Sequence, residues 1–283
     1  MRIRNFCRAS LVALLLFACG RDANPALTAD SSPLEHPDFK WAHGKGEGYE
    51  LYWERHLSPG PTFHLFRRLL PAARSNALRL IGEPDIAPPL NVLLVGSRAA
   101  MKTLTGREAN GMALPRHHAI VLVFRGSPNT LAIRHETMHV LTHALWPGDG
   151  NNPWVREGLG VLAGGQCSGF TPRQVAAHLA AVGRLPLLSD VQTRFWQLDE
   201  LPAHLSSASF MQFLYETHGS EALRAIWVRG MAGLADHLGQ PRDTIETRWY
   251  EYLNAVPMQE RPADWSRFAS GCRWDPDALS DAA

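Results

Sequence analysis

The sequence predicts an α+β fold, in which a small mixed sheet is followed by a mainly helical C-terminal half. Two short apolar runs, residues 90–95 and 119–124, each lead into a turn containing glycine and are typical of strands. After residue 124 the apolar residues recur at helical spacing between capping residues. Of the 283 residues 45% are hydrophobic, so the chain can bury a substantial core.

The N-terminal residues 1–19 have the layout of a secretory signal. Arginines precede an apolar run at residues 11–18 that is too short to span a bilayer. The run ends in Leu-Phe-Ala-Cys-Gly, which resembles the lipobox of bacterial lipoproteins. This resemblance implies a lipid on Cys19 and a membrane anchor at the bacterial cell envelope, on its periplasmic or extracellular face. An ordinary cleaved signal and an uncleaved anchor are the alternatives.

Charge and cysteine content limit the classes of binding partner and indicate the redox compartment of the protein. The chain has 28 basic and 27 acidic residues, so no global field draws it toward nucleic acid, and we expect no nucleic-acid partner. Once Cys19 and the signal are set aside, Cys167 and Cys272 remain. In an oxidising compartment these two suggest one disulfide. A zinc role for Cys167, or two separate buried thiols, would leave the same counts.

The rest of the chain divides by composition. Residues 20–48 are rich in Pro, Asp, Ser and Gly and are expected to form a flexible tether. Residues 49–256 are expected to form one folded domain, and residues 257–283 an irregular tail packed on it. Residues 62–80 have helical spacing interrupted by Pro71, which predicts one helix or two. Residues 97–104 also look helical, and residues 106–115 look like a loop.

The second half is predicted to be a series of helices. The first begins at Asn129 or Thr130, either of which can cap it, and stops at the Trp-Pro-Gly sequence of residues 146–148. The later ones have plausible caps and an apolar period near 3.6. Their expected ranges are 153–163, 171–182, 206–217, 220–229 and 241–253.

The first of these helices carries His135-Glu136-Thr137-Met138-His139. Histidines four residues apart lie one turn apart on the same helix face, so both imidazoles can reach one metal ion. Neutral imidazole nitrogens suit zinc, and Glu136 beside them can accept a proton from water that the metal has acidified. The pattern therefore indicates a catalytic metal site.

A catalytic zinc needs a third protein ligand and an open position. His143 is on the same face, but on a straight helix it lies about 12 Å along the axis from His135, too far to share one ion. Glu157 follows His139 on a new helix, reached through a loop that can fold back antiparallel. The alternative is a solvated Glu157 paired with Arg156.

The His135 to His139 motif followed by Trp154-Val155-Arg156-Glu157-Gly158-Leu159 resembles the gluzincin pattern, specifically the exported peptidase MA-like lipoproteins. The resemblance covers roughly residues 90–229. It implies a zincin-like fold, one Zn²⁺ per chain held by His135, His139 and Glu157, and Glu136 as the base. One departure is Val161, where related enzymes often have an acidic residue, and another is Gly160, where they often have Ala.

The resemblance also implies an oxyanion stabiliser and a substrate strand. His204 stands where family members have a Tyr at the start of a later helix, so it is the candidate stabiliser, against a capping or surface role. The strand at residues 120–124 is expected to be the sheet edge on which an extended peptide adds by main-chain hydrogen bonds. His117 and His118 before it are candidates for the cleft wall, although paired loop histidines more often face solvent.

These residues predict zinc-dependent hydrolysis of peptide bonds in peptide or protein substrates. The principal alternative is a lipid-anchored binding or assembly factor that keeps the zincin fold without turnover. A third possibility is an amide hydrolase acting on cell-envelope material, which the same chemistry permits. The intact Glu136 favours catalysis, because metal binding alone does not require it.

Overall fold

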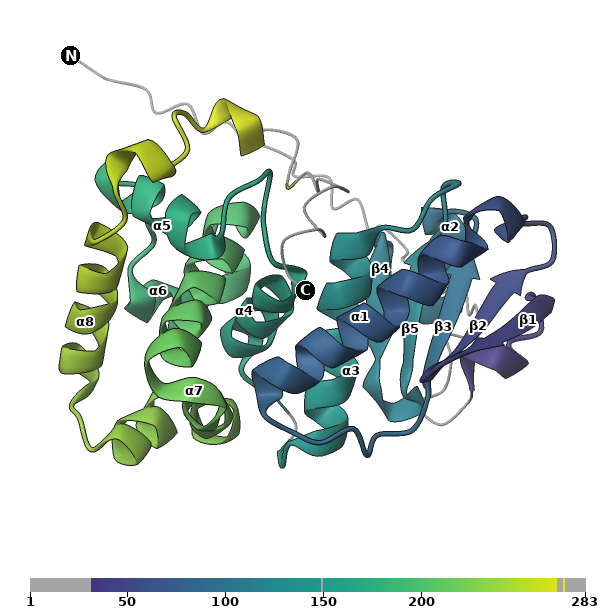
Figure 1. Cartoon of the computed structure of the whole chain (residues 1–283), viewed down its shortest axis with the longest axis horizontal. Coiled ribbons are helices and arrows are strands. Elements are labelled where there is room, and N and C mark those ends of the chain that lie inside the picture. The colour runs from purple at the N-terminus through teal and green to yellow at the C-terminus, as the bar shows by residue number, and fades with distance from the viewer. Residues whose placement is uncertain (1–31, 149, 269–271, 273–283) are drawn as a thin grey trace, which may run out of the picture.

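The computed structural model describes residues 32–148, 150–268 and 272, and Figure 1 shows a sheet with its helices beside a larger group of helices. The fold is α+β, as the sequence predicts. Cys19 and the other residues of the expected signal lie outside the described residues. None of the helices in the described ranges is long and apolar enough to cross a membrane.

The sheet has five strands in the order β1-β2-β3-β5-β4. β2 pairs parallel with β3, and β3 pairs parallel with β5. The outer strands β1 and β4 are antiparallel to their neighbours β2 and β5. The strands are β1 Trp41–Gly46, β2 Tyr49–Glu54, β3 Leu90–Val95, β4 Gly111–Leu114 and β5 Ala119–Val123.

Alternating side chains of β3 and β5 face two different layers. Val92 and Leu94 of β3 join Ile120 and Leu122 of β5 in a core with the helices on one face of the sheet. Leu93, Val95, Val121 and Val123 point to the other face, where the helix after β3 covers them. The strands are buried on both faces, which explains why they appear in the sequence as continuous apolar runs.

Eight α-helices complete the described fold (Figure 1). α1 and α3 cover one face of the sheet and α2 covers the other. Apolar residues of α1, α3, α4, α5, α7 and α8 share one large core, which joins the sheet half to the helical half. The helices are α1 Phe63–Ile81, α2 Arg98–Thr105, α3 Thr130–Leu145, α4 Pro153–Gly164, α5 Pro172–Ala181, α6 Leu188–Arg194, α7 Glu200–Leu238 and α8 Arg242–Asn254.

Three strands, β1, β2 and β4, were missing from the predicted elements. The tether expected to run to residue 48 is wrong at its C-terminal end, because Trp41–Gly46 forms β1 in a hairpin with β2. Gly48 adopts a φ of 71° in the turn, a conformation that glycine enters at little cost. The loop expected at residues 106–115 contains β4. β1 and β4 contain glycine, β4 has only four residues, and both become strands through their pairing partners.

The helix predictions hold with changes at the ends. α1 is one continuous helix that includes Pro71. α7 is interrupted by non-helical conformations at Gly219 and at Arg229 and Gly230, which separates the two helices predicted at residues 206–217 and 220–229. α6 and the two ends of α7, residues 200–205 and 231–238, were not predicted.

Cys167 and Cys272 form a disulfide, which is the pairing that the cysteine count suggested. It ties the loop after α4 to the C-terminal tail across 105 residues. Trp265 of the tail stacks on His178 of α5, with ring centroids 6.5 Å apart. The described part of the tail therefore packs on the helical half.

Candidate metal centre

The centre is built from α3 and α4. Asn129 caps α3 by accepting a hydrogen bond from the backbone N–H of Ala132, so the helix starts in the register that turns His135 and His139 to the cleft. The opposite face of α3, including Met138 and Leu141, is buried in the large core. Packing of that face therefore fixes the direction in which the two imidazoles point.

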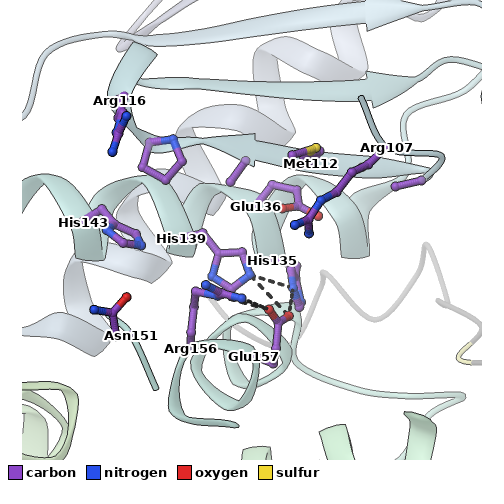
Figure 2. Close-up of a pocket in the computed structure, with 14 residues that line it drawn as sticks. Arg107, Met112, Arg116, His135, Glu136, His139, His143, Asn151, Arg156 and Glu157 are labelled. Carbon is purple, nitrogen blue, oxygen red and sulfur yellow. Dashed lines mark hydrogen bonds and ion pairs between the residues drawn. The ribbon is translucent and has the colours of Figure 1, made fainter. Parts of the chain in front are cut away.

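α4 is held against α7, and this contact fixes Glu157. Trp154 is 1% exposed and packs on Phe210 of α7 with ring centroids 5.7 Å apart. One turn later, a Cβ on Gly158 would lie 3.0 Å from the backbone of Ser207, a tight contact that would push the two helices apart by a few tenths of an ångström. Between these contacts Glu157 points the other way, toward α3 (Figure 2).

Three donor atoms converge at the centre. The Nε2 atoms of His135 and His139 are 2.9 Å apart. Oε2 of Glu157 lies 3.2 Å from Nε2 of His135 and 3.6 Å from Nε2 of His139. Two donors on a tetrahedral ion, each about 2.1 Å from it, are about 3.4 Å apart. The observed separations bracket this value, so the three groups fit around one metal ion.

Glu136 is a second carboxylate beside the histidines. Donor atoms of His135, Glu136 and His139 lie within 4.8 Å of one another, and such a group can bind a metal ion. Glu157 makes the closer approach to both imidazoles, and its side chain is only 12% exposed. The distances therefore favour Glu157 as the third ligand and leave Glu136 beside the site, facing β4 (Figure 2).

The two oxygens of Glu157 have different partners. Arg156 places Nε and Nη2 each 3.2 Å from Oε1, whereas the histidines contact Oε2. The alternative expected from the sequence was a solvated Glu157 paired with Arg156. The pair with Arg156 is present, but the carboxylate is largely buried. Arg156 orients the carboxylate and leaves one oxygen for a metal.

The electrostatics of the centre favour added positive charge. Burial alone would raise the pKa of Glu157, but hydrogen bonds from His135 and His139 outweigh it and hold the pKa well below its usual range. Burial alone would lower the pKa of His135, yet its hydrogen bond to Glu157 and the charge of Glu136 raise it. A site that stabilises a proton on its imidazoles also suits a cation in the same place.

Two glycines make room for the site. A Cβ on Gly160 would lie 2.7 to 2.8 Å from three atoms of the His135 ring, so the ring rests directly on this part of α4. A Cβ on Gly111 of β4 would lie 3.1 Å from Oε1 of Glu136. The His135 ring therefore packs on α4, and the Glu136 carboxylate packs against β4 on the other side of α3.

His204 of α7 reaches the edge of the centre. Its Nε2 lies 3.8 Å from Oε2 of Glu157, and its Nδ1 lies 2.7 Å from the carbonyl oxygen of Glu200. Because a carbonyl only accepts, Nδ1 donates, and Nε2 of the neutral ring has no proton to offer. Burial is the main cause that lowers the pKa of His204. Oxyanion stabilisation by this residue would therefore need its protonated form.

Other expected residues lie farther from the centre. His143 lines the same cavity, but its ring packs edge-on against Trp227, with centroids 5.2 Å apart. His118 turns away and contacts the carbonyl oxygen of Pro88 at 2.8 Å, and neither it nor His117 lines the cavity. Val161 packs in a small apolar cluster, and Nδ1 of His139 is buried without a hydrogen-bond partner among the described residues.

The edge of the sheet next to the centre is β4. The expectation that residues 120–124 form this edge is wrong, because β5 lies between β3 and β4. Gly111, Met112 and Ala113 of β4 line a cavity of about 640 Å³ together with the donor residues. A four-residue strand containing glycine gave no alternating pattern, so nothing in the sequence marked it.

Comparison with family models and with curated proteins identified no relative of this chain. No family model matches the chain, and no curated protein matches it significantly. The resemblance to gluzincins therefore depends on the two motifs and on the geometry that brings them together.

Proposed function

We propose that this chain is a zinc-dependent peptidase of the gluzincin type, with His135, His139 and Glu157 as ligands of one Zn²⁺. The observation that carries the proposal is the convergence of Nε2 of both histidines with Oε2 of Glu157, at separations of 2.9, 3.2 and 3.6 Å. Two imidazoles and one carboxylate form a ligand set typical of catalytic zinc in metallopeptidases.

The position of Glu136 supports hydrolysis over metal storage. When bound, zinc would supply Lewis acidity that polarises the substrate carbonyl and lowers the pKa of water. Glu136 lies between the histidines and β4, where its carboxylate can take a proton from water and pass it to the departing amine. Arg156 holds Oε1 of Glu157, so the ligand carboxylate keeps its orientation while Glu136 exchanges protons.

The free edge of β4 supports a peptide as substrate. Within the described sheet, β4 pairs on one side only, with β5, and its other side faces the cavity. An extended peptide can add there by main-chain hydrogen bonds, which would place its carbonyl groups over the metal ligands. The substrate would be a peptide or a protein segment in extended conformation.

The proposed location is the bacterial cell envelope, with a lipid on Cys19 as the anchor. The support is the lipobox-like sequence of the N-terminal region and the disulfide between Cys167 and Cys272, since disulfides persist in oxidising compartments. Radiolabelled palmitate incorporation that is lost in Cys19→Ala tests the anchor.

Elemental mass spectrometry of the full chain is the first test of the metal. We expect about one zinc per wild-type chain and a large loss in His139→Ala and Glu157→Gln. Glu136→Gln should keep its zinc and lose hydrolysis of a casein-derived peptide mixture by about 100-fold or more. Zinc that is unaffected by Glu157→Gln would overturn the ligand set. Wild-type zinc with no activity that depends on Glu136 would favour a binding or assembly role.

A further inference from the structure

The cavity over the metal centre is rich in arginine. Three arginines line it, against two glutamates that both belong to the proposed chemistry. A bound divalent cation would increase this positive excess further. The whole chain is nearly balanced, with 28 basic and 27 acidic residues, so the excess is a local property of the cavity. The lining arginines are Arg107, Arg116 and Arg156.

Two of these arginines have no acidic partner. Arg156 is engaged by Glu157, as described above. Among residues 32–148, 150–268 and 272, the side chains of Arg107 and Arg116 form no ion pair and no hydrogen bond, and both are exposed. Glu108, the nearest acidic residue in sequence to Arg107, has its carboxylate 3.7 Å from Arg98 instead. Both guanidinium groups are therefore available to a ligand.

The backbone fixes both arginines at the cavity. The hydroxyl of Thr105 donates to the carbonyl of Met101 in α2 at 2.8 Å and accepts from the N–H of Arg107 at 3.3 Å, so it ties the backbone of Arg107 to the end of this helix. Arg116 sits in a 3-10 turn of residues Pro115–His117, which Asn91 holds by donating to the carbonyl of His117 at 3.3 Å. The anchored turns fix the backbone of both arginines beside the cavity, and their side chains can adjust to a ligand.

Arg107 precedes β4 and Arg116 follows it. Figure 2 shows Arg116 at one end of the cavity and the side chain of Arg107 beside Glu136 toward the other end, with His139 between the two arginines. A peptide paired with β4 would pass one arginine before the reacting bond and the other after it. Guanidinium groups bind carboxylates through charge-assisted, often bidentate hydrogen bonds, and a cleft with low-dielectric walls concentrates the field.

We propose that this cleft selects acidic peptide segments, with Arg107 binding an Asp or Glu side chain on one side of the reacting bond and Arg116 binding one on the other. The inference rests on the proposed function for the existence of a reacting bond. It adds the class of substrate and the residues that recognise it. Neither arginine takes part in the reaction.

Retention of a random dodecapeptide library tests the inference without catalysis. The library is passed over immobilised, zinc-loaded full chain carrying Glu136→Gln, and the retained peptides are sequenced. We expect Asp and Glu to be enriched roughly three- to tenfold, with the enrichment falling as salt is raised. Adding Arg107→Gln and Arg116→Gln should abolish it, and Lys at both positions should restore part of it, because lysine returns the charge without the bidentate geometry. Arg68→Gln, an exposed arginine of α1 outside the cavity, is the matched control.

Cleavage by the Glu136-containing chain gives the positions. The best-cut peptide is compared with versions in which one acidic residue is replaced by its amide, and kcat/KM is measured for each. Arg107→Gln should reduce the preference for the acid on one side of the cleaved bond, and Arg116→Gln should reduce it on the other side. Retention or cleavage without acidic preference, a preference that survives the double substitution, or both variants acting on the same side would overturn the inference. Acidic retention that needs both arginines, but without any cleavage, would instead refute the proposed peptidase activity and support only the selection of acidic segments by the two arginines.

Discussion

Replacing Gly160 with alanine separates metal binding from stability. The new Cβ would lie 2.7 Å from Cε1 of His135 and 2.8 Å from both ring nitrogens, whereas carbon atoms in contact are about 3.5 to 4.0 Å apart. The ring must therefore retreat by roughly 0.7 Å or more. Distances at a metal site are tolerated to within about 0.2 Å, so His135 would leave its place among the ligands.

Two effects oppose each other in this variant. Alanine in a helix interior is more favourable than glycine by up to about 1 kcal/mol, which offsets part of the steric cost of moving the His135 ring in the metal-free chain. The displaced ligand should weaken zinc binding by about 10- to 100-fold, which corresponds to about 1.4 to 2.7 kcal/mol. The first effect changes the unfolding free energy of the metal-free chain and the second changes the zinc affinity, so each can be measured separately.

A competition titration against a chromophoric zinc chelator measures the affinity, and thermal unfolding in EDTA measures the metal-free stability. Gly164→Ala is the matched control, because it lies on the same helix and its Cβ would meet only Leu131, at an ordinary 3.7 Å. It should bind zinc as the wild type does. Zinc affinity of Gly160→Ala within twofold of the wild type would refute the close contact between the His135 ring and Gly160 of α4.

Three further predictions concern the tail, the Arg74–Asp85 ion pair and the edge of the site. Cys272→Ser opens a disulfide that spans 105 residues and should lower the unfolding free energy by about 2 to 4 kcal/mol in urea titrations, a loss that disappears when both proteins are reduced. The hydrogen bond that Asp85 accepts from Arg74 lowers the pKa of Asp85 below 3.8, so the Arg74–Asp85 pair stabilises the fold above that pH. The stability gap between wild type and Asp85→Asn should therefore shrink as the pH falls below about 4, and a gap that widens there would contradict the pairing. If His204 stabilises the oxyanion, His204→Gln should keep more kcat than His204→Phe, and the reverse order would show that its contribution is packing.

The local chemistry of the site could be predicted from the sequence. Spacing alone put His135 and His139 on one helix face, and the Trp-x-x-Glu-Gly pattern pointed to Glu157, because both depend on short-range helical geometry. The strands at residues 90–95 and 119–124 were recognisable because they are buried on both faces and so are apolar throughout.

The elements that shape the cleft depended on distant partners. β4 has only four residues and includes a glycine, so its conformation comes from pairing with β5 and not from its own propensity. β1 likewise forms because β2 supplies its hydrogen bonds. The expected substrate strand was misassigned for this reason: the order of strands in a sheet is a property of the assembled fold.

The sequence by itself determined which residues carry the proposed chemistry, because metal-ligand spacing along a helix is fixed by its 3.6-residue turn. Only the tertiary structure decided what surrounds them: that Arg156 holds one oxygen of Glu157, that the ring of His135 rests on Gly160, and that Arg107 and Arg116 stand at the two ends of β4. These relations join residues from separate elements. They arise from the packing of α3 against α4 and β4, which no local pattern in the chain encodes.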